Sequence, residues 1–132
     1  MSRTRLAAIM AAALIANTVT AQQKLGEVGY VTEGLIAVGI AFEISEVCGT
    51  IQPRTLRGIA YLNQLRNHAK GLGFSGAEID AFTDDRAEQD RLEGIARARL
   101  ASMGATPGDE AAHCTVGQAE IGRGSTIGYL LR

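Results

Sequence analysis

The chain has 132 residues, a formal net charge of −1 at pH 7, and a composition that is 46% hydrophobic but only 5% aromatic. This length suits one domain, and the near balance of charge argues against binding to nucleic acid or to an anionic membrane through overall charge. Because the chain has no Trp and few other aromatic residues, it offers no platform on which bases could stack.

The first 21 residues have the composition of a secretory signal peptide. Arg3 and Arg5 supply a positively charged start, residues 6–16 form an apolar core, and residues 19–21 read Val-Thr-Ala, a small-residue cleavage site. An apolar core of this length is too short to span a bilayer. We therefore expect cleavage near Ala21, delivery to the periplasm or the medium, and no stable membrane insertion of the mature chain.

Residues 22–132 are predicted to form a single helical domain after cleavage. This mature segment has 111 residues and keeps 11 of the 13 basic residues and all 14 acidic residues, so its net charge is −3. A segment of that size can bury one core. Apolar residues recur at helical spacing along most of it, which predicts an all-α fold: a small bundle of about five helices with one disulfide.

The chain has only two cysteines, Cys48 and Cys114, which lie 66 residues apart. Two cysteines in an exported protein most often form a disulfide, because the periplasm is kept oxidising. A metal site that adds His68 and His113 is one alternative, but these residues lack the close paired spacing of zinc motifs. A free catalytic thiol at Cys114 is another, although the adjacent His113 would diverge from it by about 100° on a helix. We predict the disulfide.

The first helix is predicted to begin near Thr32, after an extended and loosely packed lead-in over residues 22–31. Residues 34–42 are apolar without interruption. A helix that is apolar on every side is normally surrounded by its neighbours, so we expect this one to be central. It should end at Gly49, which we expect to act as a left-handed cap.

The second helix is predicted over residues 53–70, with Pro53 in its first turn. The stripe expected to face the core consists of Ile59, Leu62, Leu65 and Ala69. A glycine-rich turn follows, in which Leu72 and Phe74 should pack back onto the core. Residues 75–78 read Ser-Gly-Ala-Glu, a capping box that predicts the start of a third helix.

A polar stretch over residues 83–91 predicts a bend near residues 83–85, after which a fourth helical segment runs to Gly104. The acidic residues around the bend are Asp80, Asp84, Asp85, Glu88, Asp90 and Glu93. They could bind a divalent cation, but the sequence lacks the glycine-bearing loop of calcium-binding hands, and arginines are interleaved among them. We predict surface ion pairs instead, such as Glu88 with Arg91.

Asp109 is expected to cap a fifth helix over residues 110–123, which Gly124 should end. The buried side of that helix should hold Cys114, Val116, Gly117 and Ile121. Ser125 can then cap a last turn, and the apolar residues after it should join the core. These residues are Ile127, Leu130 and Leu131. The alternative is that they project outward as a docking peptide, because exposed apolar clusters usually mark interaction sites.

The sequence contains no nucleophile elbow, phosphate-binding glycine loop, HExxH helix or CxxC pair. We therefore predict no catalytic, cofactor-binding or metal-binding residue, and no cofactor. Four stretches together resemble a family of small exported bacterial proteins classed as a domain of unknown function: CGTIQPRTLRGIAYLNQL, FSGAEIDAFTDDRAE, ATPGDEAAHC and AEIGRGSTIGYLL. The resemblance covers essentially the whole mature chain and implies the same exported single-domain plan, with no known activity to carry over.

The sequence favours a non-catalytic periplasmic interaction protein, such as an accessory subunit, an inhibitor or a small chaperone-like binder, with a protein partner in the periplasm. The alternative is a small periplasmic hydrolase or metal-dependent enzyme that uses His68 or His113 with carboxylates. A pocket that holds a histidine beside two or more carboxylates would favour the enzyme, and an exposed apolar patch would favour binding.

Overall fold

A computed structural model describes residues 23–132, in which the chain forms an all-α bundle with one disulfide, as predicted. The helices are η1 (Leu25–Glu27), α1 (Gly29–Val47), α2 (Thr55–Gly71), α3 (Gly76–Asp84), α4 (Arg86–Ser102), α5 (Glu110–Arg123) and α6 (Thr126–Tyr129). The predicted signal peptide, residues 1–21, lies outside the described residues. Within the described part, none of the helices is both long and apolar enough to span a membrane.

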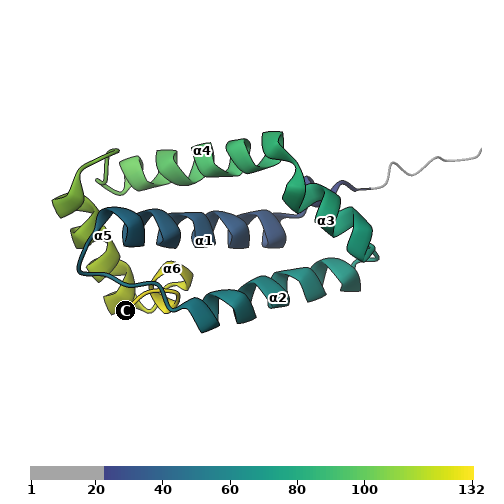
Figure 1. Cartoon of the computed structure of the whole chain (residues 1–132), viewed down its shortest axis with the longest axis horizontal. Helices are drawn as coiled ribbons and strands as arrows, with labels where there is room; N and C mark the ends of the chain where they lie inside the picture. Colours follow the sequence, from purple (N-terminus) through teal and green to yellow (C-terminus); the bar gives the residue numbers. More distant parts are fainter. Residues whose placement is uncertain (1–22) are drawn as a thin grey trace, which may run out of the picture.

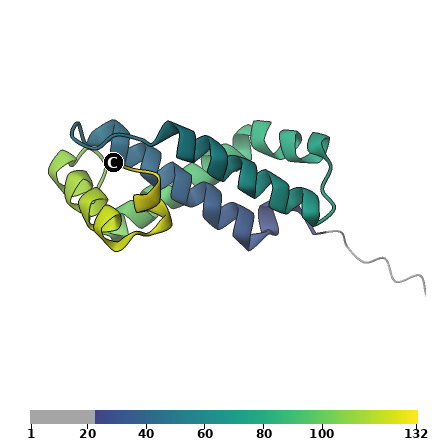
Figure 2. The same cartoon turned by 90° about the horizontal axis from the view of Figure 1, so that it is seen from below.

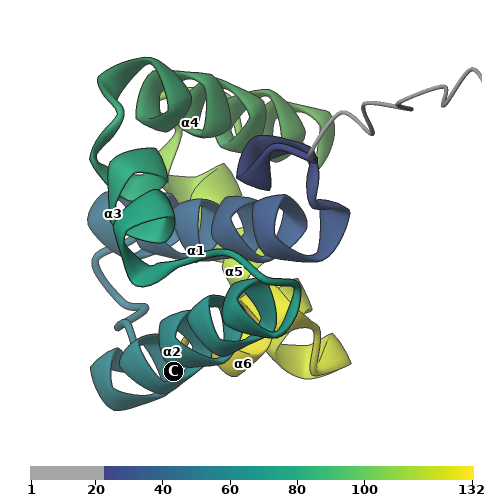
Figure 3. The ribbon, with the colours of Figure 1, turned by 90° about the vertical axis from the view of Figure 1, so that its right-hand side faces the viewer.

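Helix α1 lies in the middle of the bundle, as its apolar sequence predicts. It is flanked by α4 on one side and α2 on the other (Figure 1), and α5 and α6 gather at the end opposite α3 (Figure 2). The view along the bundle shows α4, α1 and α2 stacked in that order, with α3 in front of α1 (Figure 3). The chain therefore surrounds α1 from several sides with helices that are distant in sequence.

Helix α1 begins earlier than expected, at Gly29 instead of near Thr32. The predicted loose lead-in is also wrong, because Leu25 and Val28 are buried and form a small second core with Ala69 and Ile79. A short 3₁₀ turn gives the lead-in the spacing needed to place these side chains on one face. Gly49 does not adopt the left-handed conformation; the helix ends at an extended Cys48.

Helix α2 begins at Thr55, so the prediction that Pro53 lies in its first turn is wrong. Pro53 instead forms an antiparallel bridge with Leu131. Next to it, Gln52 and Arg132 exchange two backbone hydrogen bonds, of 2.7 and 2.9 Å. Tertiary pairing with the C-terminus therefore holds this segment extended, which a local helix-start signal cannot reveal.

The predicted core stripe of α2 is half right. Leu65 and Ala69 are buried, but Ile59 and Leu62 are 53% and 41% exposed. The line that faces α1 runs at four-residue spacing through Tyr61, Leu65 and Ala69, so Ile59 and Leu62 fall beside it. Leu72, expected to pack against the core, is also exposed, whereas Phe74 does pack against the second core.

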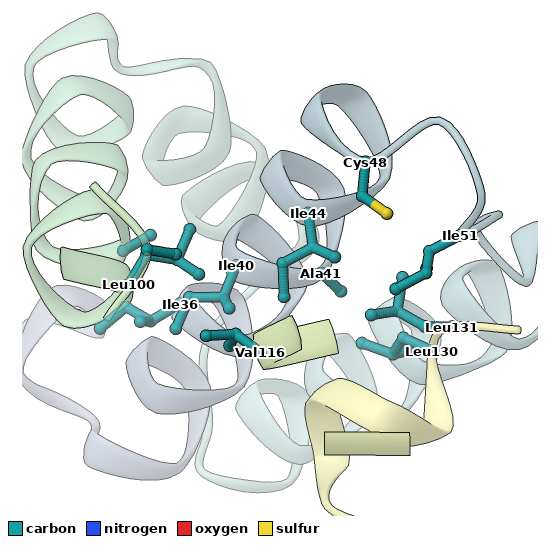
Figure 4. Packing of buried hydrophobic residues seen from close by; sticks show 12 residues of the cluster. Ile36, Ile40, Ala41, Ile44, Cys48, Ile51, Leu100, Val116, Leu130 and Leu131 are labelled. Atoms are coloured by element: carbon teal, nitrogen blue, oxygen red, sulfur yellow. The ribbon is translucent and has the colours of Figure 1, made fainter. Parts of the chain in front are cut away.

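The main core is aliphatic and draws on residues from α1 to the C-terminal segment (Figure 4). Its members include Ile36, Ile40 and Ile44 of α1, Leu100 of α4, Val116 of α5, and the two residues after α6, Leu130 and Leu131. Leu130 and Leu131 are buried and Ile127 is partly buried. The prediction that the tail belongs to the core is thus confirmed for the two leucines, and the outward docking peptide is not what the fold shows.

The helix boundaries predicted at Ser75, Asp109 and Gly124 and the bend near residues 83–85 are confirmed. The Ser75 side chain accepts from the backbone N–H of Glu78, whose carboxylate accepts from the N–H of Ser75, and Asp109 caps α5. The bend predicted before α4 falls at Asp85, whose side chain caps that helix. Gly124 ends α5 with a φ of 62°, a left-handed conformation that glycine adopts without strain.

Candidate functional site

The structure joins Cys48 and Cys114 in a disulfide, with their Cα atoms 5.1 Å apart. This bond ties the end of α1 to α5. The neighbouring His113 is almost fully buried, and its Nδ1 lies 2.6 Å from the backbone oxygen of Asp109. His68 lies elsewhere, on the surface of α2, where its ring is 4.2 Å from that of Tyr30. In residues 23–132 no group of three or more His, Cys, Asp or Glu side chains could hold a metal ion.

Four of the six acidic residues around the α3–α4 bend act as caps or ion-pair partners, namely Asp80, Asp85, Glu88 and Glu93. Glu88 pairs with Arg91 at 2.7 Å, as predicted. Asp80 lies 2.7 Å from Arg66 of α2, and the hydrogen bond from that guanidinium lowers the pKa of the Asp80 carboxyl. These contacts connect α3 to α2 and support the first turns of α4.

An apolar groove opens between α1, α3 and α4, with a volume of about 380 Å³. The α1 wall consists of Leu35, Val38, Gly39 and Phe42, and the α4 wall includes Leu92 and Ala96. Phe82 of α3 closes one end. The two walls meet closely at the bottom, because a Cβ at Gly39 would lie 3.4 Å from the Cβ of Ala96. The groove thus has two helical walls and an apolar floor.

The groove exists because α3 and α4 cover one side of α1 only in part. Residues 34–42 have no polar side, and most of the helix circumference is covered, because Gly34 and Ala41 are buried as well as Ile36, Ile40 and Ile44. On the groove side, Leu35 and Val38 are partly buried and Phe42 is 59% exposed. A helix that is apolar all round normally has cover all round, so the partly open side of α1 around Phe42 is unusual for an isolated domain.

Charged side chains line the rim of the groove. Arg97 of α4 lies 2.7 Å from Glu93 on the same helix and 3.8 Å from Glu43 on α1, so it links the two walls. Glu88 and Gln89 line the other part of the α4 wall. The lining therefore holds three carboxylates and one guanidinium.

The negative charge of the protein is concentrated beside this groove. Residues 80–93 contain six acidic and two basic side chains, a net charge of −4, whereas the rest of the described chain has nine basic and eight acidic side chains, a net charge of +1. An electrostatic field of this kind favours a partner that is basic.

A second and wider hollow, of about 700 Å³, lies between α1, α2, the end of α4 and α6. Glu33 and Arg99 form an exposed ion pair across it, with two N–O distances of 2.5 and 2.8 Å. This hydrogen bonding lowers the pKa of Glu33. Burial raises the pKa of the Tyr61 phenol, which Tyr30 raises further. The lining of this hollow is more polar than that of the groove. None of the residues that the sequence offered as catalytic or metal-binding candidates lines it.

Sequence reasoning did not identify the groove, although it noted the apolar run that forms one wall. The signal was the absence of any polar position between Glu33 and Glu43, combined with an exposed Phe42 that only a structure can show. Leu92 and Ala96, which form the α4 wall, lie in the stretch that was predicted only as a fourth helical segment. His113 and Glu120 were not expected to be buried, yet each is almost fully enclosed.

The family model described as "Family of unknown function (DUF5333)" matches residues 23–132. Neither a curated protein nor a solved structure shows a significant match to the chain. The match spans all the elements that form the groove and the disulfide.

Proposed function

The chain belongs to the DUF5333 family of unknown function, and we propose that it is an exported, non-catalytic interaction protein that binds another protein through the groove between α1 and α4. The observation that carries this proposal is the partly open side of α1, where Phe42 is exposed above the groove. A partner that covers Phe42 would remove the remaining 59% of that side chain from water, which contributes roughly 1 to 2 kcal/mol from this residue alone.

The composition of the groove supports protein binding. Its walls are largely apolar with charges at the rim, as in the buried core and polar rim of protein interfaces. A partly exposed aromatic side chain surrounded by a polar rim is typical of the anchor positions in protein interfaces. An accessory subunit, an inhibitor or a small chaperone-like binder would each use such a surface.

The enzyme alternative has no comparable support. The titratable side chains of the groove are Glu43, Glu88, Glu93 and Arg97, and neither His68 nor His113 lines it. All three carboxylates lie within ion-pair distance of an arginine. A hydrolase or metal-dependent enzyme would need a base or metal ligands at this point, so we do not propose one.

We propose export on the basis of the leader and the disulfide together. The leader has the pattern of a signal peptide, and disulfides persist mainly in oxidising compartments. Sequencing the N-terminus of the protein from its own cell should give Gln22 as the first residue of a periplasmic or secreted form. An intact leader on protein retained in the cytoplasm would contradict this part of the proposal.

The binding proposal can be tested by co-purification of a tagged chain from the exported fraction of the producing cell. Phe42→Gln should lose the bound protein, because it removes the apolar anchor without changing the charge. Leu72→Gln is the matched control, because Leu72 is 53% exposed but lies outside the groove. A bound protein that is retained by Phe42→Gln, in a variant that melts like the wild type, would overturn the proposal.

A further inference from the structure

A second apolar surface without a neighbour lies on α2. Leu56 is 83% exposed, and Ile59 and Leu62 are 53% and 41% exposed. These three residues follow one another at three-residue spacing, so they form a stripe that winds along the outer side of the first half of the helix. Large apolar side chains grouped in this way on a folded domain usually mark an interaction site.

The charge of α2 is opposite to that of the groove. Residues 47–77 contain no acidic side chain and four basic ones: Arg54, Arg57, Arg66 and Lys70. Arg54 and Arg57 are held against the C-terminal segment, since Arg54 Nε donates to the oxygen of Leu131 and Arg57 lies over the ring of Tyr129. Arg66 and Lys70 continue the line of Ile59 at spacings of seven and eleven residues. Arg66 already pairs with Asp80 of its own chain, so Lys70 is the cation on this line that a partner could reach, just beyond the apolar stripe.

We propose that the occupant of the groove is helix α2 of a second copy of this chain. In this contact the stripe Leu56–Ile59–Leu62 packs into the groove, and the basic half of α2 lies over the acidic segment 80–93 of the other copy. A single contact then covers both apolar surfaces and brings the acidic segment, which keeps an excess of negative charge after the Asp80–Arg66 pair is formed, close to a helix without acidic side chains. This inference rests on the proposed function, because it specifies what the groove binds.

The lengths of the two surfaces agree. Leu35 to Phe42 spans about 10 Å along α1, and Glu88 to Arg97 spans about 14 Å along α4, which together define a groove for about two helical turns. Leu56 to Leu62 spans about 9 Å of α2. An interface this short falls at or below the lower limit of about 1,200 Å² for stable complexes, so the association should be weak and depend on concentration.

The contact is heterologous, because the groove and the stripe are different surfaces of the same molecule. Sedimentation velocity on the disulfide-bonded mature protein should show an average mass that rises above that of the monomer between micromolar and millimolar concentrations. Phe42→Gln and Ile59→Gln should each weaken association by about tenfold or more, while Leu72→Gln should associate like the wild type. High salt should weaken the association of the wild type, because it screens the attraction between charges.

Mixing the two variants provides the sharpest test. Phe42→Gln retains an intact α2 stripe and Ile59→Gln retains an intact groove, so the mixture should form a dimer and stop there, although each variant alone remains monomeric. A mixture that stays monomeric while the wild type associates would overturn the heterologous contact. An association that high salt leaves unchanged or strengthens would overturn the role of charge.

A wild-type chain that remains monomeric throughout the concentration range would overturn this inference and leave the proposed function standing, provided that Phe42→Gln still releases a different protein in the co-purification. The proposed function is contradicted by a different result, namely that Phe42→Gln still retains every protein that co-purifies with the wild type. Both variants change positions that are partly exposed, so their melting temperatures should match that of the wild type. The melting curves therefore distinguish a variant that has lost stability from one that has lost association.

Discussion

Leu131→Ala should destabilise the domain strongly, although Leu131 is the penultimate residue of the chain. Its side chain is 1% exposed and lies beside Ile51 and Leu130 in the main core (Figure 4). Its backbone oxygen accepts a hydrogen bond of 2.9 Å from Arg54 Nε, so the segment is held in place and cannot easily move to fill a cavity. The substitution should therefore leave most of the volume of the lost atoms unfilled.

Truncating a fully buried leucine to alanine removes its transfer free energy and leaves a cavity, which together amount to about 2 to 5 kcal/mol. Domains of this size have free energies of unfolding of about 5 to 15 kcal/mol, so the loss is a large fraction of the total. A loss of about 3 kcal/mol corresponds to a decrease of about 12 °C in the melting temperature. Urea unfolding followed by circular dichroism measures the loss as a shift in midpoint at constant slope.

The matched control is Leu56→Ala, which makes the same chemical change at a position that is 83% exposed. It should change the free energy of unfolding by no more than about 0.5 kcal/mol. If Leu131→Ala shifted the urea midpoint as little as Leu56→Ala does, the C-terminal residues would not belong to the core, and the reasoning from burial would be refuted.

Three further predictions concern packing, the disulfide and pH. Gly128→Ala should lower the urea midpoint more than Gly122→Ala, because a Cβ at residue 128 would overlap the backbone oxygen of Glu120, whereas a Cβ at residue 122 meets nothing within 4 Å; equal midpoints would contradict this. Reducing the disulfide should lower the free energy of unfolding by about 4 kcal/mol. A urea midpoint that does not change when reductant is added would contradict this prediction. Arg99→Gln should destabilise the domain by up to about 1 kcal/mol near neutral pH, because Arg99 lowers the pKa of Glu33 in the folded state. The stabilisation is present above the unfolded pKa and lost as the pH falls through the folded pKa, so the difference from wild type should disappear in acid; a constant difference would count against the ion pair.

The elements that could be predicted from the sequence are those set by local chemistry. The capping box at Ser75, the cap at Asp109 and the glycine stop at Gly124 each depend on residues within a few positions of one another, and each is confirmed. The disulfide could be predicted because the chain has only two cysteines. The prediction that Pro53 lies in the first turn of a helix was wrong because a long-range contact decides the conformation there: pairing with the C-terminus keeps the backbone extended.

Burial was harder to predict wherever a polar side chain is enclosed with its own partners. The Glu120 carboxylate is buried because it accepts from Ser125 and pairs with Arg123, contacts that join the end of α5 to the cap of α6. Hydrophobic spacing ranks such a position as exposed. Hydrophobic spacing also could not show which side of α1 stays open, because that depends on where α3 and α4 pack.

The central claim, that the groove between α1 and α4 is the interaction surface, is tested most directly by photo-crosslinking in the producing cell. A light-activated phenylalanine analogue at position 42 would occupy the groove, and the same analogue at the exposed position of Gln118 on α5 is the control. We predict a crosslinked protein at position 42 and none at position 118, with an adduct of twice the chain mass if the groove holds a second copy. No adduct at position 42, or the same adducts at both positions, would contradict the claim.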